Sequence, residues 1–413
     1  MLISFHPLKK YRNFRYLYLG QLVSTFGSMI TYVALPYQIY QLTHSSLAVG
    51  MIGVVELIPL LVTALMGGHY ADSFDRKKLL VFSEIGMSVG SLALVLNSIS
   101  SEPKLWLIYC IAAFMSAVNG FHRPALESLA PRLVHRDDLP NLSSLATFKG
   151  LLGTIAGPAL GGFLIASFGI SFTFLIDFFT FLFSLWALSM LQLPPSLISK
   201  RTQISPIEGI EQGFRYAWSR PELIGSYSID FIAMIFGMPL ALFPAISESF
   251  GGAKVVGLLY AAPSAGAMIA TIFSGWTKNV HESGKAISLS ALVWGLGITA
   301  FGFSSHLWIA VPFLMIAGAA DAMSGVFRMT LWNKTIPDTL RGRLAGLEMI
   351  SYMSGPLLGN AEAGLVAAGF GTQASVVSGG ILCIIGVFVC AIFLPRFWRY
   401  NMPTSLPEEP QTT

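Results

Sequence analysis

Twelve runs of about 20 mostly apolar residues constrain the fold of this 413-residue chain more than any other feature. A helix of that length crosses the hydrocarbon core of a bilayer. The chain is 54% hydrophobic and only 11% charged, whereas soluble domains carry roughly 25% charged residues. A soluble globular protein is therefore excluded, and the sequence predicts an all-α membrane protein with twelve transmembrane helices. The expected spans are residues 16–40, 47–70, 79–98, 104–126, 142–168, 171–191, 223–246, 255–276, 286–303, 307–331, 344–367 and 373–394.

Lys and Arg are distributed unevenly between the two sides of this predicted membrane protein. Of the 25 basic residues, 20 fall in the even-numbered loops or near the two ends, and the opposite loops hold only Lys104 and Lys254. Basic residues concentrate in cytoplasmic loops. The pattern predicts that both termini are cytoplasmic, and it explains the net charge of +4 without a nucleic-acid partner.

The longest polar connection divides the twelve spans into two sets of six. Inside this connection an amphipathic pattern begins at Ser205, which indicates a short helix on the cytoplasmic membrane surface. The predicted parts are an N-terminal six-helix bundle over 1–193, a cytoplasmic linker over 194–221, a C-terminal six-helix bundle over 222–400 and a disordered tail over 401–413.

The two sets of six spans have matching sequence features. A Gly-Pro pair at 157–158 in the fifth span recurs at 355–356 in the eleventh. Arg123 near the end of the fourth span has a counterpart in Arg328 near the end of the tenth. Matching each span with the sixth one after it indicates a parallel repeat, related by an axis along the membrane normal.

A short charged loop between the second and third spans has a distinctive spacing. Gly68 would let two helices pack closely, and Asp72 could meet a helix N-terminus or a basic side chain. Arg76 and Lys77 would hold the loop on the cytoplasmic side. This run resembles the gating signature between the second and third helices of major facilitator superfamily transporters, with Asp75 where most members carry Gly.

The resemblance covers nearly the whole chain. Within the superfamily it is closest to the enterobactin-exporter-like group of bacterial proteins, which also contains macrolide-efflux relatives. It implies a major facilitator fold and a secondary active transporter that exports a small amphipathic molecule, a siderophore, across the cell inner membrane by alternating access. The stretches that carry it are 35–39, 42–46, 75–79, 123–126, 129–134 and 157–162.

Ionisable side chains inside membrane helices are costly and mark functional sites. Asp321 and Asp230 lie deep in their spans, and Glu56 lies well inside its own. These three carboxylates are the candidates for proton coupling, with Asp321 first, although each could instead be held by a neighbouring helix. Asp321 shares a helix face with Arg328, seven residues on. Glu84 is nearer the end of its span and is expected to anchor a loop.

The candidates for substrate binding combine three basic and two neutral side chains. Arg123, Lys149 and Arg328 could receive an anionic substrate, since Arg binds carboxylate or catecholate oxygens with two parallel hydrogen bonds. The more ordinary interpretation is that they form the salt bridges that close a gate. Asn119 and Gln38 are the neutral candidates, and hydrogen bonding between helices is the alternative for both.

The sequence lacks the motifs of an ATP-driven pump or a hydrolase, so no enzyme is predicted. Its seven His have no metal-ligand spacing, and neither a metal nor a cofactor is expected. The expected partners are a small-molecule substrate, the lipid bilayer and protons, in a monomeric antiporter. The alternatives are multidrug or macrolide efflux, siderophore import, and a membrane sensor that does not transport.

Overall fold

The structure is a computed structural model that describes the backbone of residues 4–73, 75–192, 214–336 and 338–401. The side chains of residues 64–73 and 338–352 are not described. The predicted start of the linker helix at Ser205 and nearly all of the predicted tail lie outside the described residues.

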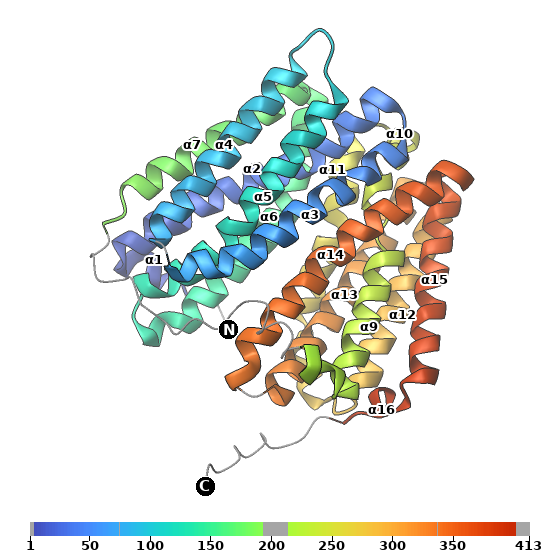
Figure 1. The fold of residues 1–413 in the computed structure, drawn as a ribbon. Helices are drawn as coiled ribbons and strands as arrows, with labels where there is room; N and C mark the ends of the chain where they lie inside the picture. The colour runs from blue at the N-terminus through green and yellow to red at the C-terminus, as the bar shows by residue number, and fades with distance from the viewer. Residues whose placement is uncertain (1–3, 74, 193–213, 337, 402–413) are drawn as a thin grey trace. The chain divides into compact units, whose positions relative to one another are not determined.

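Helices build the described part of the chain, which contains no strand (Figure 1). Each of the twelve predicted spans coincides with a helix, except that the seventh is divided between α9 and α10. The long helices are α2 (Arg12–Thr43), α3 (Ser46–Ser73), α4 (Arg76–Ser98), α5 (Leu105–Leu129), α6 (Leu139–Phe168), α7 (Ile170–Ser189), α9 (Pro221–Phe236), α11 (Ala253–Ile272), α12 (Ser283–Gly302), α13 (Leu307–Thr335), α14 (Asp338–Phe370) and α15 (Thr372–Phe393). Shorter elements are α1 (His6–Lys10), η1 (Ala130–Leu133), η2 (Arg136–Asp138), η4 (Leu240–Leu242), α10 (Phe243–Phe250), η5 (Ser274–Asn279) and α16 (Pro395–Trp398).

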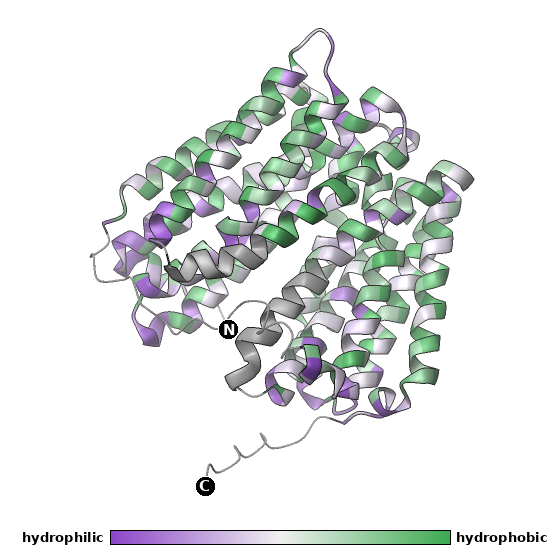
Figure 2. Cartoon of the chain, in the orientation of Figure 1, coloured by the Kyte–Doolittle hydropathy of each residue, from purple (hydrophilic) through white to green (hydrophobic). Residues whose placement is uncertain are grey.

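Ten helical segments of the described part are long and apolar enough to cross a membrane. α2 has sufficient length at 32 residues, but its Gln, Ser and Thr residues lower its mean hydropathy. α14 also has sufficient length at 33 residues, and the side chains of its first half are not described. Figure 2 shows hydrophobic residues along most of the helices and hydrophilic residues gathered near α1 and α16.

The seventh span is divided because its sequence cannot continue one helix. α9 ends at Phe236 with Gly237 as its C-cap, and Pro239 follows, which lacks the amide hydrogen that a helix requires. The indole Nε1 of Trp294 on α12 lies where a Cβ at Gly237 would be. The close approach of α12 therefore requires Gly at this helix end.

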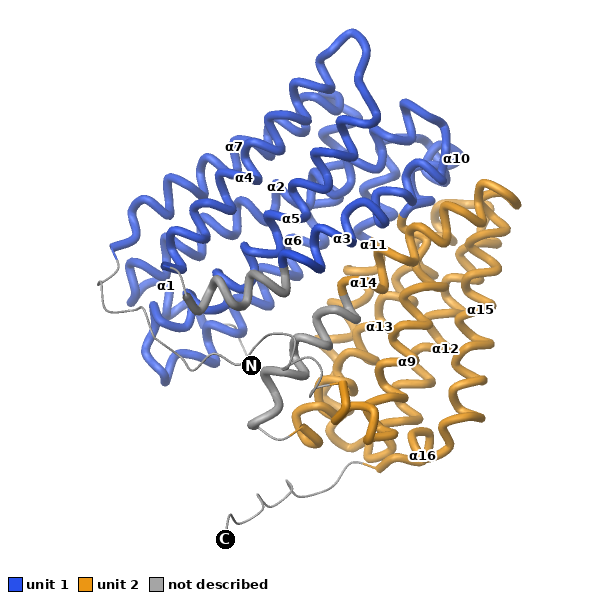
Figure 3. The backbone as a smooth tube through the Cα atoms, in the orientation of Figure 1, with its two compact units in different colours: residues 1–203, 241–261 blue, residues 204–240, 262–413 orange. Residues whose placement is uncertain are grey.

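The chain forms two compact units (Figure 3). Unit 1 contains residues 1–203 and 241–261, and unit 2 contains residues 204–240 and 262–413. In unit 1, α2 packs on α6 and α7, and α4 packs on α5 and α7. In unit 2, α9 packs on α14 and α15, and α12 packs on α13 and α15. These are the same pairs shifted by six spans, in agreement with the parallel repeat that the sequence indicates.

Residues 241–261 follow α9 in the chain but pack within unit 1. The Gln41 amide of α2 donates to the Glu248 carboxylate of α10 at 3.1 Å. The rings of Tyr32 and Tyr260 are 5.5 Å apart in an edge-to-face arrangement. Since α11 continues past residue 261, this helix begins in unit 1 and ends in unit 2.

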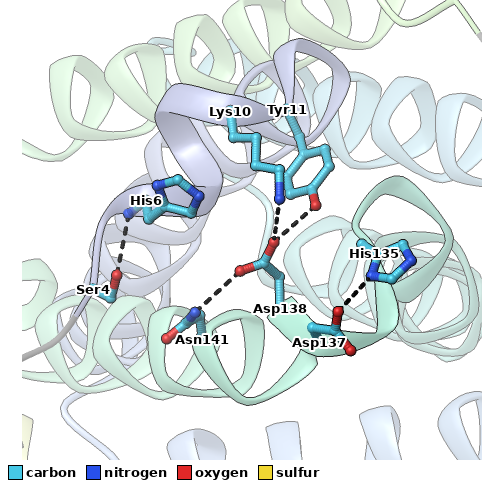
Figure 4. A network of polar contacts seen from close by, with 8 residues as sticks. All are labelled: Ser4, His6, Lys10, Tyr11, His135, Asp137, Asp138 and Asn141. Atoms are coloured by element: carbon cyan, nitrogen blue, oxygen red, sulfur yellow. Dashed lines mark hydrogen bonds and ion pairs between the residues drawn. The ribbon is translucent and has the colours of Figure 1, made fainter.

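The junction of α1 with the membrane helices is held by a polar network at the start of α6 (Figure 4). Lys10 Nζ and Tyr11 Oη both donate to Asp138 Oδ2, at 3.2 and 2.8 Å. Asn141 Nδ2 donates to the other carboxylate oxygen at 3.2 Å. The contacts of Lys10 with Tyr11 and Asp138 raise the pKa of its ammonium above the usual value. The network ties the N-terminal segment to α6.

This network predicts how α1 responds to loss of one carboxylate. In Asp138→Ala, the amides of His6 and of residues 8–10 should exchange hydrogen faster, because Lys10 of α1 and Tyr11 just after it lose their contacts with Asp138. Asp137→Ala is the matched control, since Asp137 pairs only with His135 among the described side chains and is exposed. Hydrogen exchange followed by mass spectrometry measures both. Equal protection of these amides in the parent and in Asp138→Ala would contradict this role.

Candidate transport site

Arg328 of α13 lies between two carboxylates inside unit 2. Its Nη1 forms an ion pair with Oδ1 of Asp230 on α9, and its Nη2 lies 3.9 Å from Asp321 Oδ1. Asp321 precedes Arg328 by seven residues, which is about two helical turns. The prediction that these two side chains share a face of their helix is confirmed. Asp230 comes from a different helix, so the ion pair joins α9 to α13.

The two carboxylates beside Arg328 differ in their access to solvent. The side chains of Arg328 and Asp230 are 13% and 7% exposed, whereas that of Asp321 is 42% exposed. Asp230 therefore neutralises the guanidinium in a largely buried pair, in which an uncompensated charge would be costly. Asp321 is the more exposed of the two carboxylates beside Arg328.

Glu84 of α4 connects α2 and α5 inside unit 1. It is fully buried, and its Oε1 accepts a hydrogen bond from Gln21 Nε2 at 2.6 Å. The same oxygen lies 3.1 Å from Nε2 of His122 on α5. The Gln21 amide also donates to Ser184 Oγ of α7 at 3.3 Å. The expectation that Glu84 anchors a loop is wrong, because its partners are side chains of neighbouring helices.

The pairing of Glu84 with His122 was not visible in the sequence. The two residues are 38 positions apart and belong to different spans. Helical spacing relates residues within one span and carries no information on which side chains meet between spans. A buried acid and a His near the ends of consecutive predicted helices were the available signal.

Asp177 of α7 is a second fully buried carboxylate of unit 1. Its Oδ2 accepts hydrogen bonds from Thr31 Oγ1 and Ser91 Oγ, each at 2.6 Å. A Cβ at Gly27 would collide with Asp177 and Thr180, so this glycine permits α2 to approach α7. The cluster holds α2 and α4 against α7 and is a structural element of the bundle.

The loop signature is described from Asp75 onward. Asp75 caps α4, because its carboxylate accepts hydrogen bonds from the amides of Lys77 and Lys78. Its φ of −64° is an ordinary backbone conformation, which explains why Gly is not needed here. Arg76 is 9% exposed, and Lys77 Nζ donates to the Leu191 carbonyl at 2.7 Å. Two further residues of the signature lie at the end of α3, where side chains are not described: Gly68 and Asp72.

The three basic candidates for substrate binding are divided between the units. Arg123 pairs with Glu127 one turn on, at 2.9 Å, and both side chains are substantially exposed. Lys149 of α6 is partly buried and interacts electrostatically with Glu84. Arg328 belongs to unit 2. A joint basic site formed by all three stays a prediction.

The remaining candidates lie on three helices of unit 1. Asn119 of α5 is exposed, whereas Gln38 of α2 is 3% exposed and its Oε1 has no hydrogen-bond partner among the described residues. Glu56 of α3 is partly buried, and its backbone carbonyl accepts a hydrogen bond from Ser116. Glu56 belongs to unit 1 and Asp321 to unit 2, so the two carboxylates are separate candidates for proton coupling.

Comparison with known families identifies the type of transporter. The model of the transmembrane secretion effector family, a major facilitator family, matches residues 3–411. The chain belongs to this family. Its members are membrane transporters, and the helix pairs described above are arranged in the major facilitator fold. This transmembrane secretion effector protein is therefore a multi-pass membrane transporter.

Similar curated proteins are named enterobactin exporters. The chain is 28% identical to the enterobactin exporter EntS of Citrobacter koseri over 410 residues, which cover 98% of both chains. It is also 28% identical to EntS of Escherichia coli K12 over 406 residues, which cover 97% of both chains. The similarity extends over nearly the whole length of these relatives.

Solved structures of other transporters share the fold at low sequence identity. A bacterial homologue of the human lysosomal transporter Spinster superposes with a TM-score of 0.77 at 13% identity, over 97% of this chain and 100% of that one. A bacterial homologue of the iron transporter ferroportin gives 0.72 at 15% identity, over 94% and 98%. Both support the major facilitator fold.

The buried ion pair of unit 2 makes a thermodynamic prediction. Asp230→Asn should lower the free energy of unfolding by about 3–5 kcal/mol, because Arg328 keeps a buried charge without its closest partner. The double variant Asp230→Asn with Arg328→Met should lose less, since it removes both charges. Glu127→Gln is the control, because breaking an exposed pair costs about 1 kcal/mol or less.

Denaturation of the purified variants in detergent measures these differences. Equal losses in the single and the double variant would contradict the prediction.

Proposed function

We propose that this transporter exports a siderophore of the enterobactin type across the bacterial inner membrane in exchange for protons. The observation that carries the proposal is the half-exposed Asp321 carboxylate beside the Asp230–Arg328 ion pair. This group offers hydrogen-bond donors and an acceptor inside a membrane bundle. Similarity to proteins named enterobactin exporters over 97–98% of the chain supports the substrate class and the direction.

Recognition of the substrate rests on the chemistry of its oxygen atoms. The guanidinium of Arg328 donates to anionic or phenolic oxygens, and the Asp321 carboxylate accepts from phenolic hydroxyls. Arg123 and Lys149 add positive charge for an anionic substrate that enters from the cytoplasm. Asn119 and Gln38 supply neutral hydrogen bonds. A molecule with several catechol groups satisfies such a set better than an apolar cation does.

Coupling to protons follows from competition at Asp321. A proton bound to this carboxylate removes the charged acceptor that a substrate hydroxyl needs, so proton and substrate occupy Asp321 in turn. That alternation is what an antiporter requires. Asp230 is a weaker candidate, because its carboxylate is already engaged by the ion pair with Arg328. Glu56 is the candidate of unit 1.

The transport cycle proceeds by alternating access of a monomer with two six-helix bundles. The loop signature of Gly68, Asp72, Arg76 and Lys77 acts as its gate. The Lys77 side chain supports this role, since its Nζ donates to the Leu191 carbonyl and so ties the start of α4 to the segment just after α7.

Proton coupling can be tested with inverted membrane vesicles and iron-free enterobactin as the substrate. The parent should accumulate it when a proton gradient is applied. Asp321→Asn keeps the shape of the side chain but cannot release a proton, so it should lose uphill transport and retain substrate exchange. Asp137→Asn, at an exposed loop carboxylate, is the control and should match the parent. Mass spectrometry of the vesicle contents measures both activities.

Unchanged uphill transport in Asp321→Asn, Glu56→Gln and Asp230→Asn alike would exclude coupling through these carboxylates. Transport of a macrolide in preference to the siderophore by the parent would favour drug efflux. Absence of any substrate-dependent flux would favour a membrane sensor.

The orientation proposed from the basic residues, with both termini in the cytoplasm, can be tested by cysteine labelling. Ser100 and Asp137 are both exposed and lie in loops at opposite ends of α5. A membrane-impermeant thiol reagent applied to intact spheroplasts should label Ser100→Cys and spare Asp137→Cys. Labelling after lysis is the control for both positions. The reverse pattern would place the termini outside.

A further inference from the structure

Each unit contains a buried carboxylate paired with a nitrogen-containing side chain, Arg or His, from another helix. In unit 2 the pair is Asp230 with Arg328, and in unit 1 it is Glu84 with His122. The Glu84 side chain is 0% exposed and that of His122 is 18% exposed. The two pairs differ in one chemical respect. An Arg side chain does not release its proton in a protein, whereas the charge of a His changes between about pH 5 and 8.

The surroundings of Glu84 leave one of its oxygens without a partner. Oε1 accepts from Gln21 at 2.6 Å and contacts His122 at 3.1 Å. Oε2 is buried and has no hydrogen-bond partner among the described residues. Burying an ionised carboxylate costs free energy when one of its oxygens has no hydrogen-bond partner. The group therefore gains from a positive charge on the adjacent imidazole.

Lys149 of α6 and Asp177 of α7 are ionisable groups of the described part of the chain that interact electrostatically with Glu84. α3 also packs on α4 and α5, and the side chains of its residues 64–73 are not described. α2 contributes the neutral Gln21, and α5 contributes His122 itself. Of these groups, Gln21 and His122 contact Glu84 Oε1 directly.

We propose that the Glu84–His122 pair is a proton-binding site of the transport cycle. The inference rests on the proposed proton coupling and adds a site in unit 1 to the carboxylates considered above. Since Oε1 of Glu84 is an acceptor, neutral His122 carries its hydrogen on Nε2. An incoming proton binds Nδ1 and forms an imidazolium next to the carboxylate. Its release from Nδ1 restores the neutral ring, so one proton is taken up and returned.

His122 can exchange this proton with its surroundings, because its side chain is partly exposed whereas that of Glu84 is fully buried. The protein contains a matched reference: His135 Nδ1 lies 3.1 Å from Asp137, the same separation, but both side chains are exposed. Comparing the two pairs isolates the effect of burial.

The site can be tested by nuclear magnetic resonance of protein labelled with ¹⁵N-histidine in nanodiscs. His122→Gln and His135→Gln assign the two ring signals. The ring of His122 should change charge between about pH 5 and 8, and Glu84→Gln should move its midpoint while leaving that of His135 in place. A His122 ring that keeps one charge state over this range would overturn the proposal, as would an unchanged midpoint in Glu84→Gln.

Transport provides the second readout. With iron-free enterobactin in inverted vesicles, His122→Gln should reduce proton-driven accumulation to the level of vesicles without the protein, while His135→Gln should keep the parental rate. Parental accumulation in His122→Gln would overturn the role of the site and leave the proposed function standing. Absence of proton-driven transport in the parent would refute the proposed function, while the ring titration would still decide whether the pair binds a proton.

Discussion

A carboxylate inside a membrane protein takes its hydrogen bonds from neighbouring side chains, because lipid offers none. Asp177 meets this requirement with hydroxyls from α2 and α4, Glu84 with side chains from α2 and α5, and Asp230 with Arg328 of α13. These partners belong to other helices, although Asp177 also accepts a hydrogen bond from Thr180 of its own helix. The buried acids therefore determine which helices lie together, in addition to the close packing that small residues permit.

The two units use the same helix pairs but different polar chemistry. α4 packs on α5 in unit 1 as α12 packs on α13 in unit 2, which reflects the internal repeat. The charged side chains on these matching helices differ between the two units. Unit 1 encloses an acid beside a His, while unit 2 encloses an acid beside an Arg, whose side chain does not release its proton in a protein. A repeated scaffold thus holds two chemically different pairs, and Asp321 adds a more exposed carboxylate to unit 2.

The sequence predicted the features that depend on local order. Hydrophobic runs located the helices, the repeat anticipated the matching helix pairs, and a seven-residue spacing placed Asp321 on the face of Arg328. Contacts between spans were outside its reach, because helical periodicity says nothing about which faces meet. For that reason neither Asp230 with Arg328 nor Glu84 with His122 was foreseen as a pair. The loop signature was recognised, but the capping role of Asp75 required the backbone conformation.

Because unit 1 contains residues from both sides of the linker, the chain cannot be cut in the linker without dividing unit 1. The peptide link at residues 203–204 separates the two sets of six spans in sequence, but residues 241–261 belong to unit 1. A fragment that ends at residue 203 therefore lacks α10 and the first turns of α11, including the partners of Gln41 and Tyr32. If two fragments were co-expressed, the second would carry residues 241–261, and the first would expose the surface that these residues cover in the intact chain. Their reassembly would resemble the exchange of a segment between subunits, in which the second fragment completes the fold of the first.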